Sequence, residues 1–302
     1  MFTSRTSLFQ CGGKGVVRLS SCLSRVLLGL LLLLGLVPAG AEETLIIGVF
    51  PRYGLRGTIE HFTPLAGYLA MQLRRPVEVR SAPSFALFEE ALERGDYDIV
   101  HFNQYHYVRS HKYLGYEVIA MNEEGGRASV AGALIVRRDS GIETVAQLKG
   151  RHIVFGGGPR AMQSYVVATW LLRREGLQDG DYVQEFAGSP ANAILTAYYG
   201  KSDAAGAGDV NLNKDVIRKR IETAELKILA QGPRLAHLPW AVSAALPVSL
   251  RRQIQSLLTT MHTTETGRQV LTAAELTALR PAQDRDYDPH RHIIRQVLGE
   301  SY

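Results

Sequence analysis

The polar pattern with the clearest chemistry in this chain is a glycine turn, Gly156–Arg160 (GGGPR). It follows a short apolar run, His152–Phe155, and precedes a predicted helix that extends to Glu175. A strand that ends in glycines and leads into a helix brings free backbone N–H groups and the positive end of the helix dipole together. Such a turn binds anions. The alternative is that the glycines only permit a tight corner between strand and helix.

Side chains near this turn add hydrogen-bond donors of two kinds. Arg160 carries a forked guanidinium that can hold an oxyanion through two bonds. Gln163 and Ser164 add neutral donors within one helical turn, and Gly157 and Gly158 supply backbone N–H groups. Proline suits the first helical turn because its missing N–H would have been unpaired there. The turn therefore predicts a site for a small anion.

Nucleotide-binding motifs fit this turn poorly. The phosphate-binding loop ends in Gly-Lys-Ser/Thr, and no lysine occurs between Gly156 and Ser164. The dinucleotide fingerprint requires a third glycine where this chain has Ala161. A small anion is the better prediction.

Motifs for metal binding or catalysis are weak. His101, His106 and His111 recur every five residues, a spacing that places them on different faces of a helix or strand. His290 and His292 lie in a polar tail that we expect to be solvated. No Gly-x-Ser-x-Gly elbow and no paired-histidine zinc motif occur. We therefore expect no catalytic residues, no metal ligands and no cofactor, and an enzyme remains only a minor alternative.

Strands and helices alternate through the first part of the chain. The predicted strands are 45–50, 77–81 and 98–102, and the helices between them cover 62–73 and 85–92. This order is typical of a parallel sheet with helices on its faces. Glu123–Gly126 is predicted to be a surface loop.

A second alternation follows and suggests a second lobe. Its predicted strands are 130–136, 152–155, 204–207 and 226–230, with helices at 160–175 and 190–199. We place the crossings between lobes near Val136 and Gly232. The expected organisation is a first lobe over 42–136, a second lobe over 137–232, and a return to the first lobe with C-terminal helices over 233–302. The predicted fold class is α/β, with a ligand cleft between the two lobes.

The N-terminal segment has the pattern of a secretory signal peptide. Four basic residues precede the apolar run Val26–Val37, and Ala39–Ala41 offers small residues at the cleavage site. We predict a signal peptide over residues 1–41 and export to the periplasm; an uncleaved anchor is the alternative. The remaining chain has 30 basic and 29 acidic residues and no cysteine, because Cys11 and Cys22 precede the cut. Its net charge gives no argument for nucleic acid, and thiol chemistry is excluded.

Five short motifs follow one another in an order found in a known family. They are LIIGVFP at 45–51, LERGDYDIV at 92–100, QYHYV at 104–108, QLKGR at 147–151 and YYGKSDAA at 198–205. Together they resemble the PhnD-like phosphate, phosphite and phosphonate substrate-binding proteins of ABC transporters. The resemblance covers most of the chain after residue 41 and implies a type II periplasmic binding fold.

The resemblance also implies positions for ligand-binding residues. It places Arg52 and Tyr53 at the cleft, with Asn103, Gln104 and Tyr107 after the third strand. It places the family's anion turn on 156–163 and its later acidic residue at Asp209, at the end of a small-residue strand where α/β clefts open. Two positions depart from the family. The Ser-Thr-Ser-Gly turn is replaced by Gly-Gly-Gly-Pro-Arg-Ala-Met, and Pro190 stands where the family often has histidine.

The expected function is capture of a small oxyanion, similar to phosphate, phosphite or a phosphonate, for an inner-membrane ABC transporter. The partners would be the anionic ligand and the transporter permease, and the protein would act as a monomer. The alternatives are a periplasmic sensor subunit that signals to a kinase or cyclase, and an exported α/β enzyme. The sequence leaves the ligand's identity open.

Overall fold

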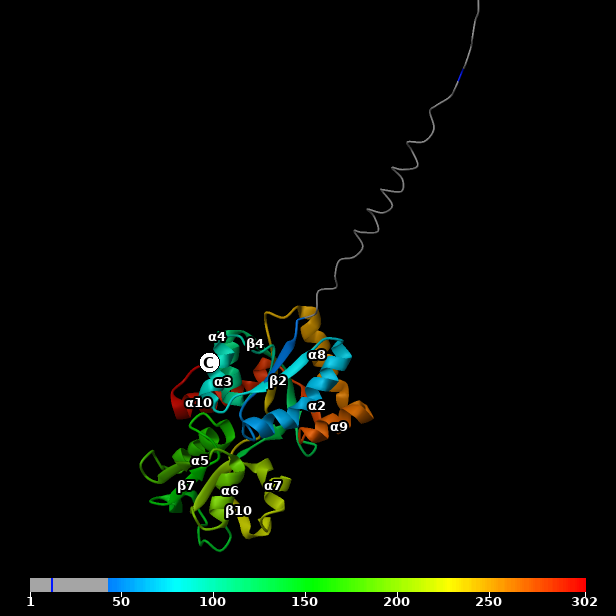
Figure 1. The fold of residues 1–302 in the computed structure, drawn as a ribbon. Helices are drawn as coiled ribbons and strands as arrows, with labels where there is room; N and C mark the ends of the chain where they lie inside the picture. The colour runs from blue at the N-terminus through cyan, green and yellow to red at the C-terminus, as the bar shows by residue number, and fades with distance from the viewer. Residues whose placement is uncertain (1–11, 13–42) are drawn as a thin grey trace, which may run out of the picture. The chain divides into compact units, whose positions relative to one another are not determined.

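A computed structural model of the protein describes Gly12 and residues 43–302. The segment Glu43–Tyr302 forms one unit of two α/β lobes, seen as a ribbon in Figure 1. The predicted signal peptide, apart from Gly12, lies outside the described residues. Within the described part, no helix combines the length and apolar character needed to cross a membrane.

The first lobe is built on a six-stranded sheet in the order β13-β4-β12-β3-β1-β2. Its strands are β1 Leu45–Val49, β2 Val77–Ser81, β3 Ile99–His101, β4 Tyr116–Glu123, β12 Pro239–Ser243 and β13 Ala278–Pro281. Strand β1 pairs in parallel with β2 and β3, while β12 runs antiparallel to both β3 and β4. The three predicted parallel strands are therefore present, and the chain adds antiparallel strands at one side.

Helices cover both faces of this sheet. They are α2 Leu55–Leu73, α3 Phe85–Glu93, α4 Gln104–Leu114, α8 Val248–Thr260, α9 Glu265–Ala273 and α10 Asp288–Leu298. Figure 1 shows α2, α8 and α9 on one side of the lobe and α3, α4 and α10 on the other. Alternate residues of β1 enter the two cores: Ile47 packs with the α2 side and Ile46 with the α3 side. This period of two explains why LIIGV is apolar throughout.

The second lobe has a five-stranded sheet in the order β10-β6-β9-β7-β8. Its strands are β6 Gly132–Arg137, β7 His152–Phe155, β8 Val183–Phe186, β9 Ala204–Gly208 and β10 Leu226–Gln231. Its helices are the π-helix η2 Met162–Val167, α5 Ala168–Arg174, α6 Pro190–Tyr198 and α7 Asp215–Arg218. Strand β7 pairs in parallel with β8 and β9, and β6 is antiparallel to β9. The α/β class and the two-lobed type of fold are thus confirmed.

Two short strands join the lobes. Strands β5 Ser129–Val130 and β11 Leu235–Ala236 pair antiparallel where the chain leaves the first lobe and where it returns. The strand that ends near Val136 is β6, and it lies in the second sheet. The first crossing is therefore several residues earlier than the expected one near Val136, because the apolar run 130–136 contains both β5 and β6.

The C-terminal segment differs from the expected polar tail. Strand β13 joins the first sheet beside β4, and α10 packs against α4 and against η2 and α5 of the second lobe. His290 lies on the inner face of α10 and is fully buried, so its predicted solvation is wrong. The residues at helical spacing from it, Ile293, Ile294 and Val297, are also buried. One face of α10 is therefore buried, although most residues of the segment are polar.

Candidate ligand-binding site

A cavity of ≈ 100 Å³ lies where the two lobes and their crossover strands meet. The first lobe contributes the loop after β1, the start of α3 and the residue that caps α4. The second lobe contributes the end of β7, the first turn of η2 and the loop after β9. The described residues that line the cavity include Phe50, Arg52, Phe85, Asn103, Val130, Gly156, Gly157, Gln163, Ser164, Pro190, Asn211 and His237, and none of the lining residues is acidic.

Three buried side chains of this lining carry polar atoms without a partner among the described residues. They are Arg52 at Nη1, His237 at Nε2, and Gln163 at both amide atoms. An unpaired buried donor costs free energy unless a bound group satisfies it. Arg52 belongs to the first lobe, Gln163 belongs to the second, and His237 follows β11, where the chain returns to the first lobe. One ligand could therefore pair with all three donors.

Backbone contacts determine which nitrogen of His237 carries the proton. The N–H of Leu238 donates to Nδ1 over 2.8 Å, so Nδ1 is the acceptor and Nε2 holds the proton. Burial lowers the pKa of His237 to about 4 and outweighs the nearby Glu124 carboxylate. The ring is therefore neutral at neutral pH, and its Nε2–H lies 3.8 Å from Glu124 Oε1 without a hydrogen-bond partner among the described residues.

Glycines in the second sheet position the first turn of η2. A Cβ at Gly206 would lie 2.3 Å from the Ser164 carbonyl oxygen, and one at Gly132 would lie 2.5 Å from that of Gln163. The π-helix backbone therefore rests directly on β6 and β9. This close approach explains the small-residue strand AAGAG and fixes Gln163 and Ser164 at the cavity.

The glycine turn itself is used differently from the prediction. The N–H of Gly156 donates to the Gly206 carbonyl, and that of Gly157 donates to Phe155. Both groups are therefore occupied: that of Gly156 extends the pairing of β7 with β9 into the turn, and that of Gly157 bonds back to the last residue of its own strand. The helix begins at Met162 and not at Arg160, and the first N–H groups of a helix have no partner within it. These N–H groups, next to the cavity-lining Gln163 and Ser164, replace the glycine N–H groups as candidate anion donors.

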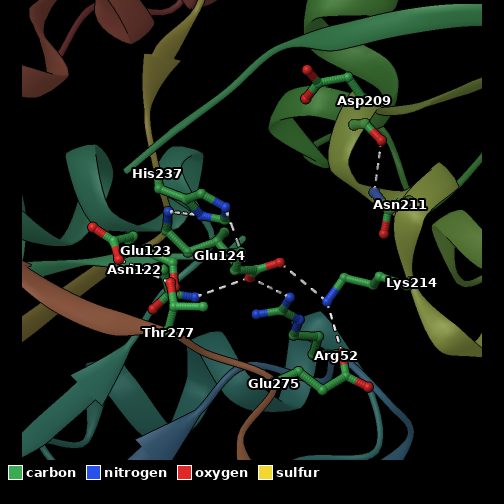
Figure 2. Close-up of polar contacts among 12 residues, drawn as sticks. Arg52, Asn122, Glu123, Glu124, Asp209, Asn211, Lys214, His237, Glu275 and Thr277 are labelled. Carbon is green, nitrogen blue, oxygen red and sulfur yellow. Dashed lines mark hydrogen bonds and ion pairs between the residues drawn. The ribbon is translucent and has the colours of Figure 1, made fainter. Parts of the chain in front are cut away.

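A network of buried and partly buried charged side chains adjoins the cavity (Figure 2). Arg52 Nη2 donates to Glu124 Oε1 over 2.7 Å, and Lys214 Nζ lies 3.1 Å from the other oxygen of Glu124. Lys214 also donates to Glu275 Oε2 over 2.8 Å, which in turn accepts from the Tyr53 hydroxyl over 2.9 Å. Burial alone would raise the pKa of Glu124, but Arg52, His237 and Lys214 outweigh it and lower that pKa strongly. Glu124 is therefore ionised.

Five of the residues expected at the site line the cavity: Arg52, Asn103, Gly157, Gln163 and Ser164. Asn103 also caps α4, since its side chain accepts from the Tyr105 N–H over 3.1 Å. Tyr53 lines a wider adjoining cleft of ≈ 600 Å³, together with Lys214 and Glu275. Its ring stacks on His61, and burial raises the pKa of its hydroxyl.

The other expected residues lie apart from the cavity lining. Gly158 and Arg160 border a separate hollow beside Phe85, and Arg160 is half exposed and paired with Glu89. Gln104 and Tyr107 are fully buried inside the first lobe, where Tyr107 donates to Asp284 over 2.8 Å. Asp209 supports the crossover: it accepts from the Ala131 N–H over 3.0 Å, from Arg234 over 2.8 Å and from Gln231 over 2.9 Å.

Three residues of the site were missed by sequence reasoning: Glu124, Lys214 and His237. Glu124 precedes Gly125 and Gly126, which have φ of 56° and 75° and form a tight turn. The N–H and carbonyl of Glu124 both bond to Arg127 across this turn, which fixes the carboxylate inward instead of in a surface loop. Such a Gly-Gly turn was a detectable signal; Lys214 and His237 had none, because their partners are distant in sequence.

Two lobes with a polar cavity at their junction define a type II periplasmic substrate-binding protein. Solved structures share this fold. A binding-protein component of an ABC phosphonate transporter from Pseudomonas aeruginosa aligns with a TM-score of 0.74 at 14% identity, covering 84% of this chain and 86% of that one. PhnD1 from Prochlorococcus marinus in complex with methylphosphonate gives 0.74 at 16%, covering 85% and 99%. A Xanthomonas citri protein bound to ATP gives 0.73 at 17%, covering 85% and 98%.

The family model for the periplasmic substrate-binding protein of phosphonate ABC transporters matches residues 47–287. The chain belongs to this family, and the predicted resemblance is confirmed. It is a substrate-binding component of an ABC transporter, in a family of transport proteins and not of enzymes.

Proposed function

We propose that this protein captures a small oxyanion in the cavity between its lobes and delivers it to the permease of an inner-membrane ABC transporter. The observation that carries the proposal is the set of unpartnered donors on Arg52, His237 and Gln163 around a cavity lined by no acidic residue. An anion accepts from all three donors, whereas a cation or a neutral apolar ligand would leave them unpaired.

Binding from both lobes supplies a mechanism for signalling occupancy. Arg52 belongs to the first lobe and Gln163 to the second. A ligand that accepts from both binds the closed arrangement more tightly than an open one and so shifts the population toward closure. The permease would then recognise the closed, loaded protein. Export through a signal peptide cleaved after Ala41 remains part of the proposal.

The apolar part of the lining limits the ligand's size. Phe50, Phe85, Val130 and Pro190 share the cavity with the donors. With only ≈ 100 Å³ available, the cavity suits a compact anion. Phosphite, phosphate and short phosphonates are the candidates that follow from the family and from this lining. The family's Ser-Thr-Ser-Gly turn is replaced by Gly-Gly-Gly-Pro-Arg-Ala-Met in this chain, so arginine, imidazole and amide donors would take its place.

Glutamine-to-methionine substitutions test this assignment. Gln163→Met keeps the approximate shape and removes two unpartnered buried polar atoms, so the fold should be retained or stabilised. The affinity for the best anion should fall by about tenfold or more, the scale of a hydrogen bond to a charged group. Melting temperatures of refolded, ligand-free protein with phosphate, phosphite, phosphonates, sulfate and small carboxylates would identify that anion.

The matched control is Gln104→Met. Gln104 is also buried and has an unpartnered amide oxygen, but it does not line the cavity. Its substitution should leave anion affinity within about twofold, since it removes no cavity donor. Equal losses in both variants, or no stabilisation of the wild type by any anion, would contradict the assignment of this cavity.

A further inference from the structure

Glu124 is a buried carboxylate next to a cavity proposed to hold an anion. Its side chain is 7% exposed and does not line the cavity, but it accepts from Arg52 Nη2, while Arg52 Nη1 is the unpartnered donor. A ligand oxygen bound at Nη1 would therefore share one guanidinium with the Glu124 carboxylate. The two acceptors would lie on neighbouring nitrogens of the same planar group.

The charges around Glu124 balance without a ligand. Arg52 and Lys214 supply two positive charges, and Glu124 and Glu275 supply two negative charges. The remaining polar neighbours are neutral: Asn122 donates to Glu124 Oε1 over 3.3 Å, and His237 lies 3.8 Å from the same oxygen. A negative charge on the ligand therefore has no uncompensated positive side chain of this network to pair with.

We propose that Glu124 is a positioning and specificity-determining residue that makes the site select singly charged over doubly charged oxyanions. The inference rests on the proposed function of the cavity. Glu124 holds the guanidinium through Nη2, which leaves Nη1 as the unpartnered donor, and its negative charge offsets the guanidinium charge that the ligand experiences. A second ligand charge then meets repulsion from Glu124 in a buried setting, where charge interactions are screened less than in water.

A pair of isosteric probes separates the two charge states. Methanesulfonate carries one charge at all usable pH values, whereas the second proton of methylphosphonate leaves near neutral pH, as in phosphate monoesters. We expect the wild type to bind methylphosphonate more tightly as the pH falls from about 8 to about 6, by several-fold, and methanesulfonate with no such trend. Titration calorimetry over this range measures both.

Glu124→Gln tests the residue directly. The glutamine side chain keeps an oxygen that can accept a hydrogen bond from Arg52, but it carries no charge. Lys214 keeps its ion pair with Glu275 in this variant. The affinity for the doubly charged form of methylphosphonate should rise by about tenfold or more at pH of about 8, and the pH trend should flatten or reverse. Glu275→Gln is the matched control, because it removes a carboxylate of the same network that has no hydrogen bond to Arg52; its effect on the pH trend should be clearly smaller than that of Glu124→Gln.

Other titrating groups near the network cannot mimic this result. His61 lies 3.9 Å from Glu275 and is retained in Glu124→Gln, so a trend due to His61 would persist in that variant. His237 has a pKa lowered to about 4 by burial, below the range tested. Asp209 is paired with Arg234. The melting temperature of each variant shows whether it is folded.

The outcomes are distinct. Wild-type affinity for methylphosphonate that rises with pH would overturn the inference even without a variant. A pH trend that survives unchanged in folded Glu124→Gln would overturn it too. If neither probe, nor phosphate, binds the wild type at all, the proposed function of the cavity fails first, and the inference fails with it.

Discussion

Arg160 Nη1 lies 3.1 Å from Glu89 Oε2, and this ion pair joins the second lobe to the first outside the cavity lining. The guanidinium also lies over the Tyr105 ring at 5.6 Å. Glu89 in turn lies 3.1 Å from the buried His106. Arg160 therefore contacts the opposite lobe, while the cavity donors are Arg52, His237 and Gln163.

This contact predicts a modest effect of Arg160→Ala on ligand affinity. We expect a loss of at most about fivefold, because Arg160 is half exposed and ion pairs of a solvent-exposed side chain contribute about 1 kcal/mol or less. Glu89→Gln should cause a similar loss, and the double variant should be no weaker than either single one. Additive losses, with Arg160→Ala much the larger, would instead indicate that Arg160 contacts the ligand.

Lys214→Met should destabilise the folded protein. Lys214 is 12% exposed and is the second-lobe partner of Glu124 and Glu275, so its removal leaves two carboxylates with less compensation. We expect the free energy of unfolding to fall by about 3 kcal/mol, as when one partner of a buried pair is lost. Denaturant unfolding measures this. Adding Glu275→Gln to Lys214→Met should recover part of the loss; a further loss would contradict this electrostatic account.

Buried histidines predict acid sensitivity. Burial lowers the pKa of His237 to about 4 and of His290 to about 3, and it also lowers those of His101 and His106. An unfolded histidine titrates near about 6.5. Below that pH the unfolded chain binds protons that the folded protein excludes, so the free energy of unfolding should fall as pH drops from about 6.5 to about 4.

Unfolding by denaturant at several pH values in this range tests the acid sensitivity. His237→Gln should make the decline shallower, because one of the depressed groups is removed. A free energy of unfolding that stays constant from about pH 7 to about pH 5.5, above the range where most carboxylates protonate, would contradict the predicted role of the buried rings.

Gly206→Ala should disturb both stability and binding. The added Cβ would lie 2.3 Å from the Ser164 carbonyl oxygen and 2.5 Å from the Phe155 ring. Moving the first turn of η2 away should cost about 1 to 3 kcal/mol of unfolding free energy and displace Gln163. The control is Gly67→Ala on α2, where nothing lies within 4 Å of the new Cβ and helix propensity favours alanine. A well-folded Gly206→Ala protein with wild-type affinity would argue against this positioning.

Local pattern was enough to predict seven of the strands and several of the helices, but α4, β4 and β13 were not predicted. The apolar runs at β1 and β7 and the alternating run at β2 were recognised because a buried or half-buried strand needs those residues wherever it lies in the fold. The exposed edge strand β8 was missed, since none of its four residues is buried. Helix α10 was missed because its polar face dominates the composition of the tail.

The sequence by itself determined the α/β class, the two-lobed organisation and the family, because burial periodicity and motif order are local properties of the chain. Only the tertiary structure decided which polar residues meet. Arg52, Gln163 and His237 are far apart in sequence but line the same cavity. Each has a buried polar atom for which no described residue provides a hydrogen-bond partner. The Gly156 N–H group was lost to strand pairing for the same reason: a hydrogen bond depends on what lies opposite in space, which spacing along the chain does not specify.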